Sequence, residues 1–209
     1  MRNIPAILQA DSLSFSYVQP SGTPLFNKLS LRFPCGVSLI CGDEGRGKTT
    51  LLQLLAGTLS ASGQLHIKGV SLAKNATAYR RQVAWFDPRD TALNQTRARD
   101  IFATLPQSHP EFHLDALQAH IEGLSLSPHL DKALYMMSTG TRRKVLLAAA
   151  LSAQAPVTLL DQPFMALDRP SIDYLLELLA GAAQHPDRAW LVADYEAPAN
   201  VPLAGIVNL

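Results

Sequence analysis

Cysteine and charged residues are scarce in this chain. Among 209 residues there are only two cysteines, Cys35 and Cys41. They are too few for a disulfide framework and lack the spacing of a metal site, which is typical of a protein in a reducing compartment. Charged residues make up 17% of the sequence and the formal net charge is +1. These totals therefore give no reason to expect nucleic acid or an anionic membrane surface as a partner.

A long hydrophobic run is also absent. The most apolar segment, Val145 to Leu160, is interrupted by Ser152, Gln154 and Pro156, and it is too short to cross a bilayer. The first ten residues have neither the hydrophobic region nor the cleavage site of a secretory signal. We therefore expect a cytoplasmic protein that reaches a membrane only through another subunit. The length suits a single domain, residues 1–209, with room for a small subdomain.

The sequence does contain a glycine-rich segment that matches the pattern GxxxxGK[ST]. It lies between an apolar run and a leucine-rich helical pattern that starts at Thr50, and it reads Gly42-Asp43-Glu44-Gly45-Arg46-Gly47-Lys48-Thr49. Glycines let successive backbone N–H groups surround phosphate oxygens, and the helix N-terminus adds its positive dipole end. In such a loop the lysine contacts the β and γ phosphates and the Thr49 hydroxyl binds Mg²⁺. The order of strand, loop and helix therefore predicts a phosphate-binding loop.

Hydrophobic periodicity predicts an α/β fold around this loop. Alternating patterns predict antiparallel strands at 13–17 and 29–33 with a turn at 19–22, and a further strand at 65–68. Apolar runs predict buried strands at 37–41, 82–86, 157–160, 190–193 and 205–209, and helical patterns cover 49–56, 141–154 and 170–183. Alternation of strands and helices favours a mainly parallel core sheet with an antiparallel edge sheet. The helical pattern from Thr91 to about Ala133 predicts an inserted helical subdomain, residues 89–135.

A second carboxylate at the end of a neighbouring buried strand would hold Mg²⁺ together with this loop. Asp161 follows the run Val157 to Leu160 and fits that role. Ala166-Leu167-Asp168 follows it, and Met137-Ser138-Thr139-Gly140-Thr141 precedes it. With these segments the chain resembles the nucleotide-binding subunit of an ATP-binding-cassette (ABC) transporter, from about Leu13 to its C-terminus. Its compact length also faintly resembles the ATP-binding subunit of the cytochrome c maturation haem exporter.

The resemblance implies a P-loop NTPase that binds ATP and Mg²⁺ between two subunits, in a homodimer or a heterodimer with another ABC ATP-binding subunit. It implies a transmembrane permease partner at the cytoplasmic face of the inner membrane. Tyr17 stands where the family stacks an aromatic ring on adenine, with core packing as the alternative. Residues 137–141 stand at the LSGGQ signature, whose retained Ser138 and Gly140 would face the γ-phosphate of the opposite subunit. Residues 166–168 match the D-loop, which contacts that subunit.

Several positions depart from the family pattern. Gln162 stands where the family has a glutamate that polarises the attacking water, which predicts slow hydrolysis. The Q-loop glutamine is replaced by the segment 87–89, Asp-Pro-Arg, and the switch histidine by Asp194. Thr139 adds a side chain where backbone should approach phosphate closely. The histidines are expected to be surface or packing residues; they are His66, His109, His113, His120, His129 and His185.

Basic residues leave two further interpretations open. One group forms either a solvated face or a surface for an acidic partner, and it comprises Arg80, Arg81, Arg89, Arg97 and Arg99. The other, residues 142–144, is Arg-Arg-Lys at the start of a predicted helix, where positive charge opposes the helix dipole. We expect a phosphate or a partner carboxylate beside residues 142–144, or simple solvation.

The expected function is that of an ATP-binding transporter subunit that drives or regulates a permease. One alternative is a regulatory switch that binds ATP without hydrolysing it. Another is the degenerate half of a heteromeric ATPase pair, in which the other subunit supplies the catalytic glutamate. A cassette that acts on DNA or ribosomes is disfavoured, because such chains usually carry long coiled-coil insertions or a second tandem cassette.

Overall fold

The computed structural model describes residues 6–17, 24–85, 87–89 and 91–209. Within these residues a parallel sheet has the strand order β6-β7-β8-β3-β9. Its strands are β6 (Val83–Ala84), β7 (Val157–Asp161), β8 (Ala189–Asp194), β3 (Gly36–Cys41) and β9 (Leu203–Asn208). Carboxyl ends of parallel strands lie at the same edge of a sheet. The residues that follow β3, β7 and β8 therefore gather at one edge.

The predicted antiparallel pair belongs to a separate sheet with the order β2-β1-β4-β5. Its strands are β2 (Phe26–Phe33), β1 (Leu8–Phe15), β4 (Ser62–Ile67) and β5 (Val70–Ser71). The prediction for β1 was wrong at both ends, because the strand begins at Leu8 and ends before Tyr17. Ser12 has a left-handed φ of 52°, and the register shifts between Ala10 and Leu13, so the alternation of apolar residues breaks inside the strand. The predicted turn at 19–22 lies outside the described residues.

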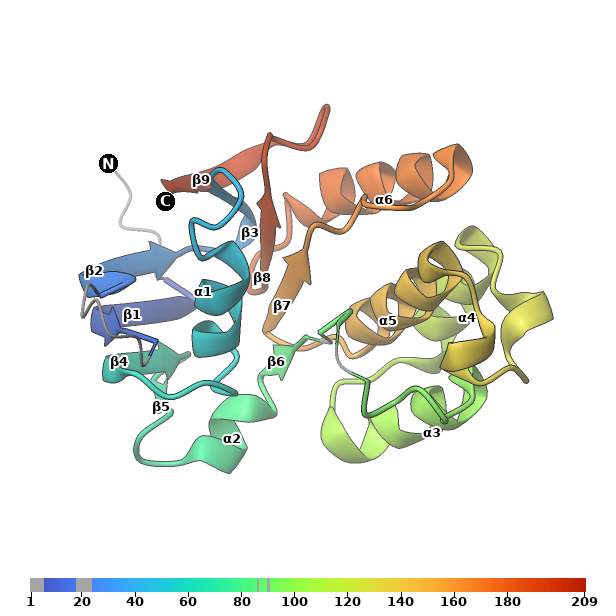
Figure 1. Cartoon of the computed structure of the whole chain (residues 1–209), viewed down its shortest axis with the longest axis horizontal. Helices are drawn as coiled ribbons and strands as arrows, with labels where there is room; N and C mark the ends of the chain where they lie inside the picture. The colour runs from blue at the N-terminus through green and yellow to red at the C-terminus, as the bar shows by residue number, and fades with distance from the viewer. Residues whose placement is uncertain (1–5, 18–23, 86, 90) are drawn as a thin grey trace.

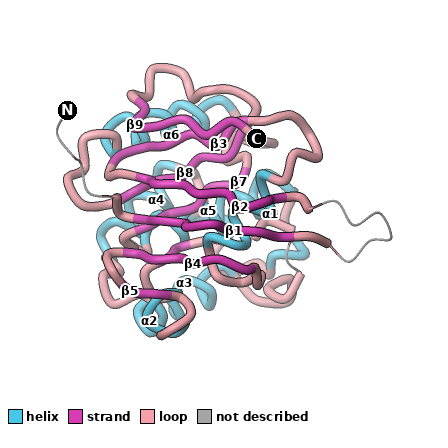
Figure 2. The backbone as a smooth tube through the Cα atoms, turned by 90° about the vertical axis from the view of Figure 1, so that its left-hand side faces the viewer, coloured by secondary structure: helices cyan, strands magenta, loops and turns pink. Residues whose placement is uncertain are grey.

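Helix α1 (Lys48–Leu55) lies between the two sheets (Figure 1). Its four leucines are fully buried, and they join one apolar cluster with residues of both sheets. On the other side of the parallel sheet, α5 (Thr139–Ser152) and α6 (Arg169–Ala182) contribute to a second cluster. Figure 2 shows the strands of both sheets crossing the molecule, with helices behind them. The phosphate-binding loop is thus attached to a helix that is packed on both sides.

A helical region continues from β6 and packs beside the parallel sheet (Figure 1). It contains α3 (Ala98–Ser108), α4 (Leu114–Gly123) and short 3₁₀ turns at Ser127–His129 and Leu134–Met136. Helix α5 packs against both α3 and α4, so the same packing extends past residue 135. The limits 89–135 of a distinct subdomain stay a prediction. Helix α2 (Ala76–Arg80) precedes β6.

Helix ends differ from the predicted ones because capping side chains set them. Helix α5 begins at Thr139, since Ser138 accepts a hydrogen bond from the Thr141 backbone N–H at 3.2 Å. Helix α6 begins at Arg169, because Asp168 caps it through the Ser171 N–H at 3.1 Å. Strand β6 is shorter than the predicted 82–86, and Phe86 lies outside the described residues. Among the helices described, none combines the length and the apolar character needed to span a membrane.

Candidate functional site

The glycine-rich segment forms a tight loop between β3 and α1. Gly45 and Gly47 have φ angles of +77° and +94°, in the left-handed region that side chains disfavour. Gly47 is also the N-cap of α1, so the first backbone N–H groups of the helix open into the loop. A loop of this shape presents N–H donors to an anion, as the sequence predicts.

Lys48 is buried at the base of this loop, with a relative exposure of 7%. Its ammonium group donates to the carbonyl oxygens of Gly42 and Asp43. The ring of Tyr195 covers the same ammonium, with its centroid 4.2 Å from Nζ. In this structure the lysine is therefore held by its own loop and by the segment that follows β8.

Thr49 and Asp161 meet at the carboxyl edge of the parallel sheet. The Thr49 hydroxyl donates to Asp161 Oδ2 at 2.6 Å. Burial raises the pKa of Asp161, and this is opposed by the Thr49 hydrogen bond and by the nearby charge of Arg89. A hydroxyl and a carboxylate at this separation are hard oxygen ligands of the kind that Mg²⁺ prefers. The two residues therefore fit the magnesium role expected of them.

Gln162 follows Asp161 with its backbone in a left-handed conformation, φ +46°. Its N–H donates to the carbonyl oxygen of Ala193 at 2.8 Å, and its own carbonyl accepts a hydrogen bond from the Arg143 guanidinium. The backbone of this residue is thus fixed from β8 on one side and from α5 on the other. Its side chain lines the hollow described next.

A hollow above the phosphate-binding loop, here called the loop hollow, brings most of the predicted site residues together. Those that line it are Tyr17, Asp43, Glu44, Gly45, Gly47, Lys48, Thr49, Thr50, Asp161 and Gln162. Gly42 and Arg46 belong to the same loop but are not among the lining residues. Ser138 and Gly140 also lie outside this set, and their role toward a second subunit stays a prediction.

Tyr17 stands at the rim of the loop hollow. Its side chain is 51% exposed, and its hydroxyl forms a 2.8 Å hydrogen bond with Thr50 Oγ1. Its ring meets Phe15 edge to face at a centroid distance of 4.8 Å. The ring is thus packed against Phe15 while about half of the residue stays exposed, so both core packing and stacking on adenine stay open for Tyr17.

Gly140 packs against the segment 166–168. A Cβ atom at this position would collide with the backbone carbonyl oxygen of Ala166. A glycine is required here by a contact within the chain, in addition to any role toward a second subunit. Ser138 acts as the N-cap of α5, which gives it a structural role as well.

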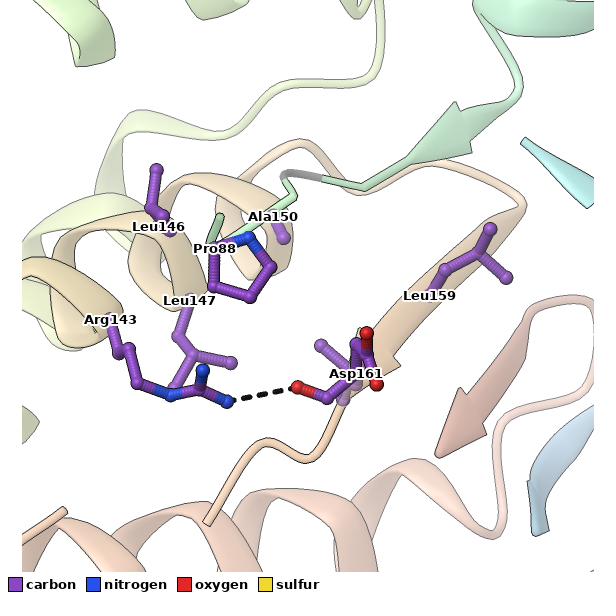
Figure 3. A pocket seen from close by; sticks show the side chains of 8 residues that line it. Pro88, Arg143, Leu146, Leu147, Ala150, Leu159 and Asp161 are labelled. Carbon is purple, nitrogen blue, oxygen red and sulfur yellow. Dashed lines mark hydrogen bonds between the residues drawn. The ribbon is translucent and has the colours of Figure 1, made fainter. Parts of the chain in front are cut away.

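The positive charges at the start of α5 find partners within the chain, which corrects both interpretations offered for residues 143 and 144. Arg143 donates to the backbone carbonyls of Asp161 and Gln162, as Figure 3 shows for Asp161. Lys144 is buried and contacts Asp168 Oδ2 at 2.7 Å. Neither a bound phosphate, a partner carboxylate nor solvation is needed to explain these charges. Arg143 is stabilised by hydrogen bonds to the carbonyls at the end of β7, and Lys144 is paired with the carboxylate that caps α6.

Three residues that line the loop hollow were missed by sequence reasoning: Leu25, Arg89 and Tyr195. The sequence placed Arg89 in the segment at the Q-loop position and in an arginine group that is either a solvated face or a surface for an acidic partner. The available signal was its position just after β6, at the sheet edge where the loop lies. Tyr195 follows Asp194, where the search was for histidine alone. Other arginines of that group pair within the chain, as Arg97 does with Asp100 and Arg99 with Asp131.

Comparison with known proteins places the chain in a family. Residues 26–165 match the family model described as ABC transporter. A cobalt import ATP-binding protein (CbiO) of Rhodobacter capsulatus is 35% identical over 84% of this chain, which spans 65% of that protein's length. The cytochrome c biogenesis ATP-binding export protein CcmA of Pseudomonas fluorescens is 31% identical over 80% of this chain and 79% of that protein.

Solved structures share the fold. The structure described as an ATP binding subunit of an ABC transporter has a TM-score of 0.78 and 20% identity, and it covers 90% of this chain and 79% of its own. CbiO1 from Clostridium perfringens has a TM-score of 0.65 and 21% identity over 92% of this chain and 79% of its own. Members of this family bind ATP with Mg²⁺, which suits the residues that meet in the loop hollow. The chain belongs to the ABC transporter family and is an ATP-binding subunit of the P-loop, α/β type.

Proposed function

We propose that this chain binds Mg-ATP in the loop hollow, at the interface between two ATP-binding subunits, and drives or regulates a membrane permease with slow hydrolysis. The observation that carries the proposal is the meeting of Lys48, the Thr49–Asp161 pair and Gln162 in one hollow. One relative is named an importer and another an exporter. The proposal therefore concerns nucleotide chemistry and coupling to a permease, and not the direction of transport. The permease would place the chain at the cytoplasmic face of the inner membrane, without a nucleic-acid partner.

The residues of the chain divide the work between phosphate and metal. Lys48 and the backbone N–H groups of the loop hold the phosphates, while Thr49 and Asp161 hold Mg²⁺. The ion, when bound, neutralises charge on the phosphate oxygens. Tyr17 at the rim offers its ring to adenine, and Ser138 and Gly140 are offered to the nucleotide of the second subunit.

Slow hydrolysis follows from the chemistry of Gln162. Phosphoryl transfer depends mainly on positioning and electrostatics, and a glutamine amide can orient a water molecule but carries no charge to polarise it. The backbone of Gln162 is fixed from both sides, so its side chain starts from a defined place. The amide therefore keeps the positioning part of the glutamate's role and loses the electrostatic part.

The test is single-turnover hydrolysis of Mg-ATP by the wild type, Lys48→Ala and Gln162→Glu. We expect the wild type to exceed the Lys48→Ala background by a small factor and Gln162→Glu to exceed the wild type by roughly ten-fold or more. A fast wild type that Gln162→Glu does not accelerate would contradict slow hydrolysis.

A second candidate function is supported by the same position and by the segment after β8. There the chain has Asp194 and Tyr195, so neither residue supplies the histidine that the family resemblance leads us to expect. This favours an ATP-dependent switch, or one half of a heteromeric pair. Nucleotide binding with hydrolysis at the Lys48→Ala level would select this candidate.

A further inference from the structure

Arg89 lies on the connection between β6 and α3 and lines the loop hollow together with Lys48 and Asp161. Its backbone N–H donates to Asp87 Oδ1 at 2.9 Å, a local side-chain turn. Residue Pro88, between them, packs toward α5 beside Arg143 and Leu147 (Figure 3). Contacts of Arg89 with Asp87, and of Pro88 with α5, therefore help to position Arg89.

The guanidinium of Arg89 keeps donors available to a ligand. Asp87 contacts it through Nε, at 3.3 Å, and the Arg89 side chain is 61% exposed. Among the described residues this ion pair engages the stem side of the guanidinium, so the fork formed by the terminal amino groups remains. An exposed ion pair of this kind holds its partners weakly.

The lining of the loop hollow contains both acidic and basic side chains. Its lining carries the acidic side chains of Asp43, Glu44 and Asp161, with Lys48 buried at the base. Arg89 lines this hollow together with Thr49 and Asp161, so its side chain is a further cation at the same site. An arginine fork matches phosphate oxygens in a bidentate arrangement that lysine does not reproduce.

We propose that Arg89 binds the terminal phosphate of ATP and makes the site discriminate ATP from ADP. The inference rests on the proposed function, because it assumes that nucleotide occupies the loop hollow. Lys48 and the loop hold the β and γ phosphates, while Arg89 lines the hollow with Asp161 and Gln162 and adds a second cationic contact to the γ-phosphate from that side. ADP lacks the phosphate that would reach this side. Arg89 thus supplies a cationic contact in a segment where the family resemblance led us to expect an uncharged glutamine.

The experiment compares equilibrium binding of fluorescently labelled Mg-ATP and Mg-ADP to the wild type, Arg89→Ala and Arg89→Lys. A hydrogen-bonded charge pair with phosphate predicts that Arg89→Ala weakens ATP binding roughly ten-fold or more. ADP binding should change by less than about three-fold, because Arg89 would not touch ADP. Arg89→Lys should fall between the two proteins, since it keeps the charge and loses the fork.

Arg99→Ala is the matched control, because Arg99 is also exposed but pairs with Asp131 at 2.7 Å. It should leave both affinities unchanged. Equal loss of ATP and ADP affinity in Arg89→Ala, or no loss of either, would overturn the role of Arg89 while leaving the proposed function intact. Failure of the wild type to bind either nucleotide would overturn both. Thermal melting of each variant verifies that the fold is retained.

Discussion

At the scale of single residues, Asp161 shows how the fold and the chemistry make opposite demands. Burial at the end of β7 disfavours the charged carboxylate, whereas the Thr49 hydroxyl and the charge of Arg89 favour it. Burial is the largest effect, so the pKa of Asp161 is raised. Burial also raises the pKa of Asp194, at the end of the neighbouring strand β8, and the charge of Asp161 raises it further. Asp161 is therefore easier to protonate than an ordinary aspartate.

We predict opposite pH dependences for binding and for stability. Mg²⁺ requires the ionised carboxylate, so the affinity for Mg-ATP should begin to fall at a pH above the ordinary aspartate range. The free protein should gain stability as pH falls through the raised pKa, because in that window the folded state binds more protons than the unfolded state. Binding titrations and thermal melts over a pH series measure both effects.

Two variants separate Asp161 from other titrating groups. Asp161→Asn should remove its part of both dependences, while protonation of the nucleotide itself remains and serves as the background. Asp87→Asn removes a charge that raises the pKa of Asp161, so the loss of affinity should begin at a lower pH than in the wild type. An identical pH profile for the wild type and Asp161→Asn would refute this account.

At the scale of helices and strands, two glycines in helices differ in whether a neighbouring segment packs against them. Gly140 lies in the first turn of α5 against the carbonyl of Ala166, whereas Gly181 lies in α6 with no described atom within 4 Å of an added Cβ. Gly140→Ala should lower the free energy of unfolding by about 1–3 kcal/mol, because α5 or the segment 166–168 must move. Gly181→Ala should raise it by roughly 0.5–1 kcal/mol through helix propensity. Chemical denaturation of the two variants measures both changes, and equal effects would contradict the packing of Gly140.

Element types were predictable from sequence where a regular pattern survives. Helix α1 is a good case, because its four leucines and the preceding loop fix its type and place. Strand β1 is the opposite case, because the left-handed Ser12 and the register shift interrupt the alternation on which the prediction depended. The helix starts were displaced because Ser138 and Asp168, which cap α5 and α6, were interpreted only as parts of the signature segment and of the D-loop.

At the scale of the whole molecule, Arg143 and Lys144 at the start of α5 connect this helix to the end of β7 and to the start of α6. Lys144 reaches the Asp168 cap of α6, and its hydrogen bond lowers the pKa of Asp168 to about 2, with the Ser171 hydrogen bonds as a further cause. A lowered pKa means that this contribution to stability is present above the ordinary aspartate value of about 4. It is lost as the pH falls through about 2.

Substitutions at Asp168 should separate the ion pair from the helix cap. Asp168→Asn retains a capping oxygen and should cost up to about 1 kcal/mol of unfolding free energy, since solvent screens the half-exposed carboxylate. Asp168→Ala also removes the cap and should cost about 1 kcal/mol more. Asp173→Asn is the control, because its pair with Arg169 is exposed on both sides. Indistinguishable denaturation midpoints for the three variants would argue against the connection.

The candidate site was predictable where one short segment carries it. The phosphate-binding loop could be found because it directly follows the apolar run 37–41, and Asp161 because it directly follows the apolar run 157–160. Arg89 and Tyr195 could not be assigned, because they enter the loop hollow from the ends of β6 and β8. Their placement depends on strand order, and the sequence gives no direct measure of strand order. The partners of Arg143 and Lys144 were missed for the same reason.

The bond from Arg143 to the backbone of Asp161 and Gln162 has a mechanical consequence. Arg143 belongs to α5, which moves with α3 and α4 if the helical layer turns against the sheet. Such a turn must either pull the main chain at Gln162 or break the hydrogen bonds that hold it. Arg143 therefore links the two layers mechanically, and a force applied to the helical layer is transmitted to the backbone of Asp161 and Gln162.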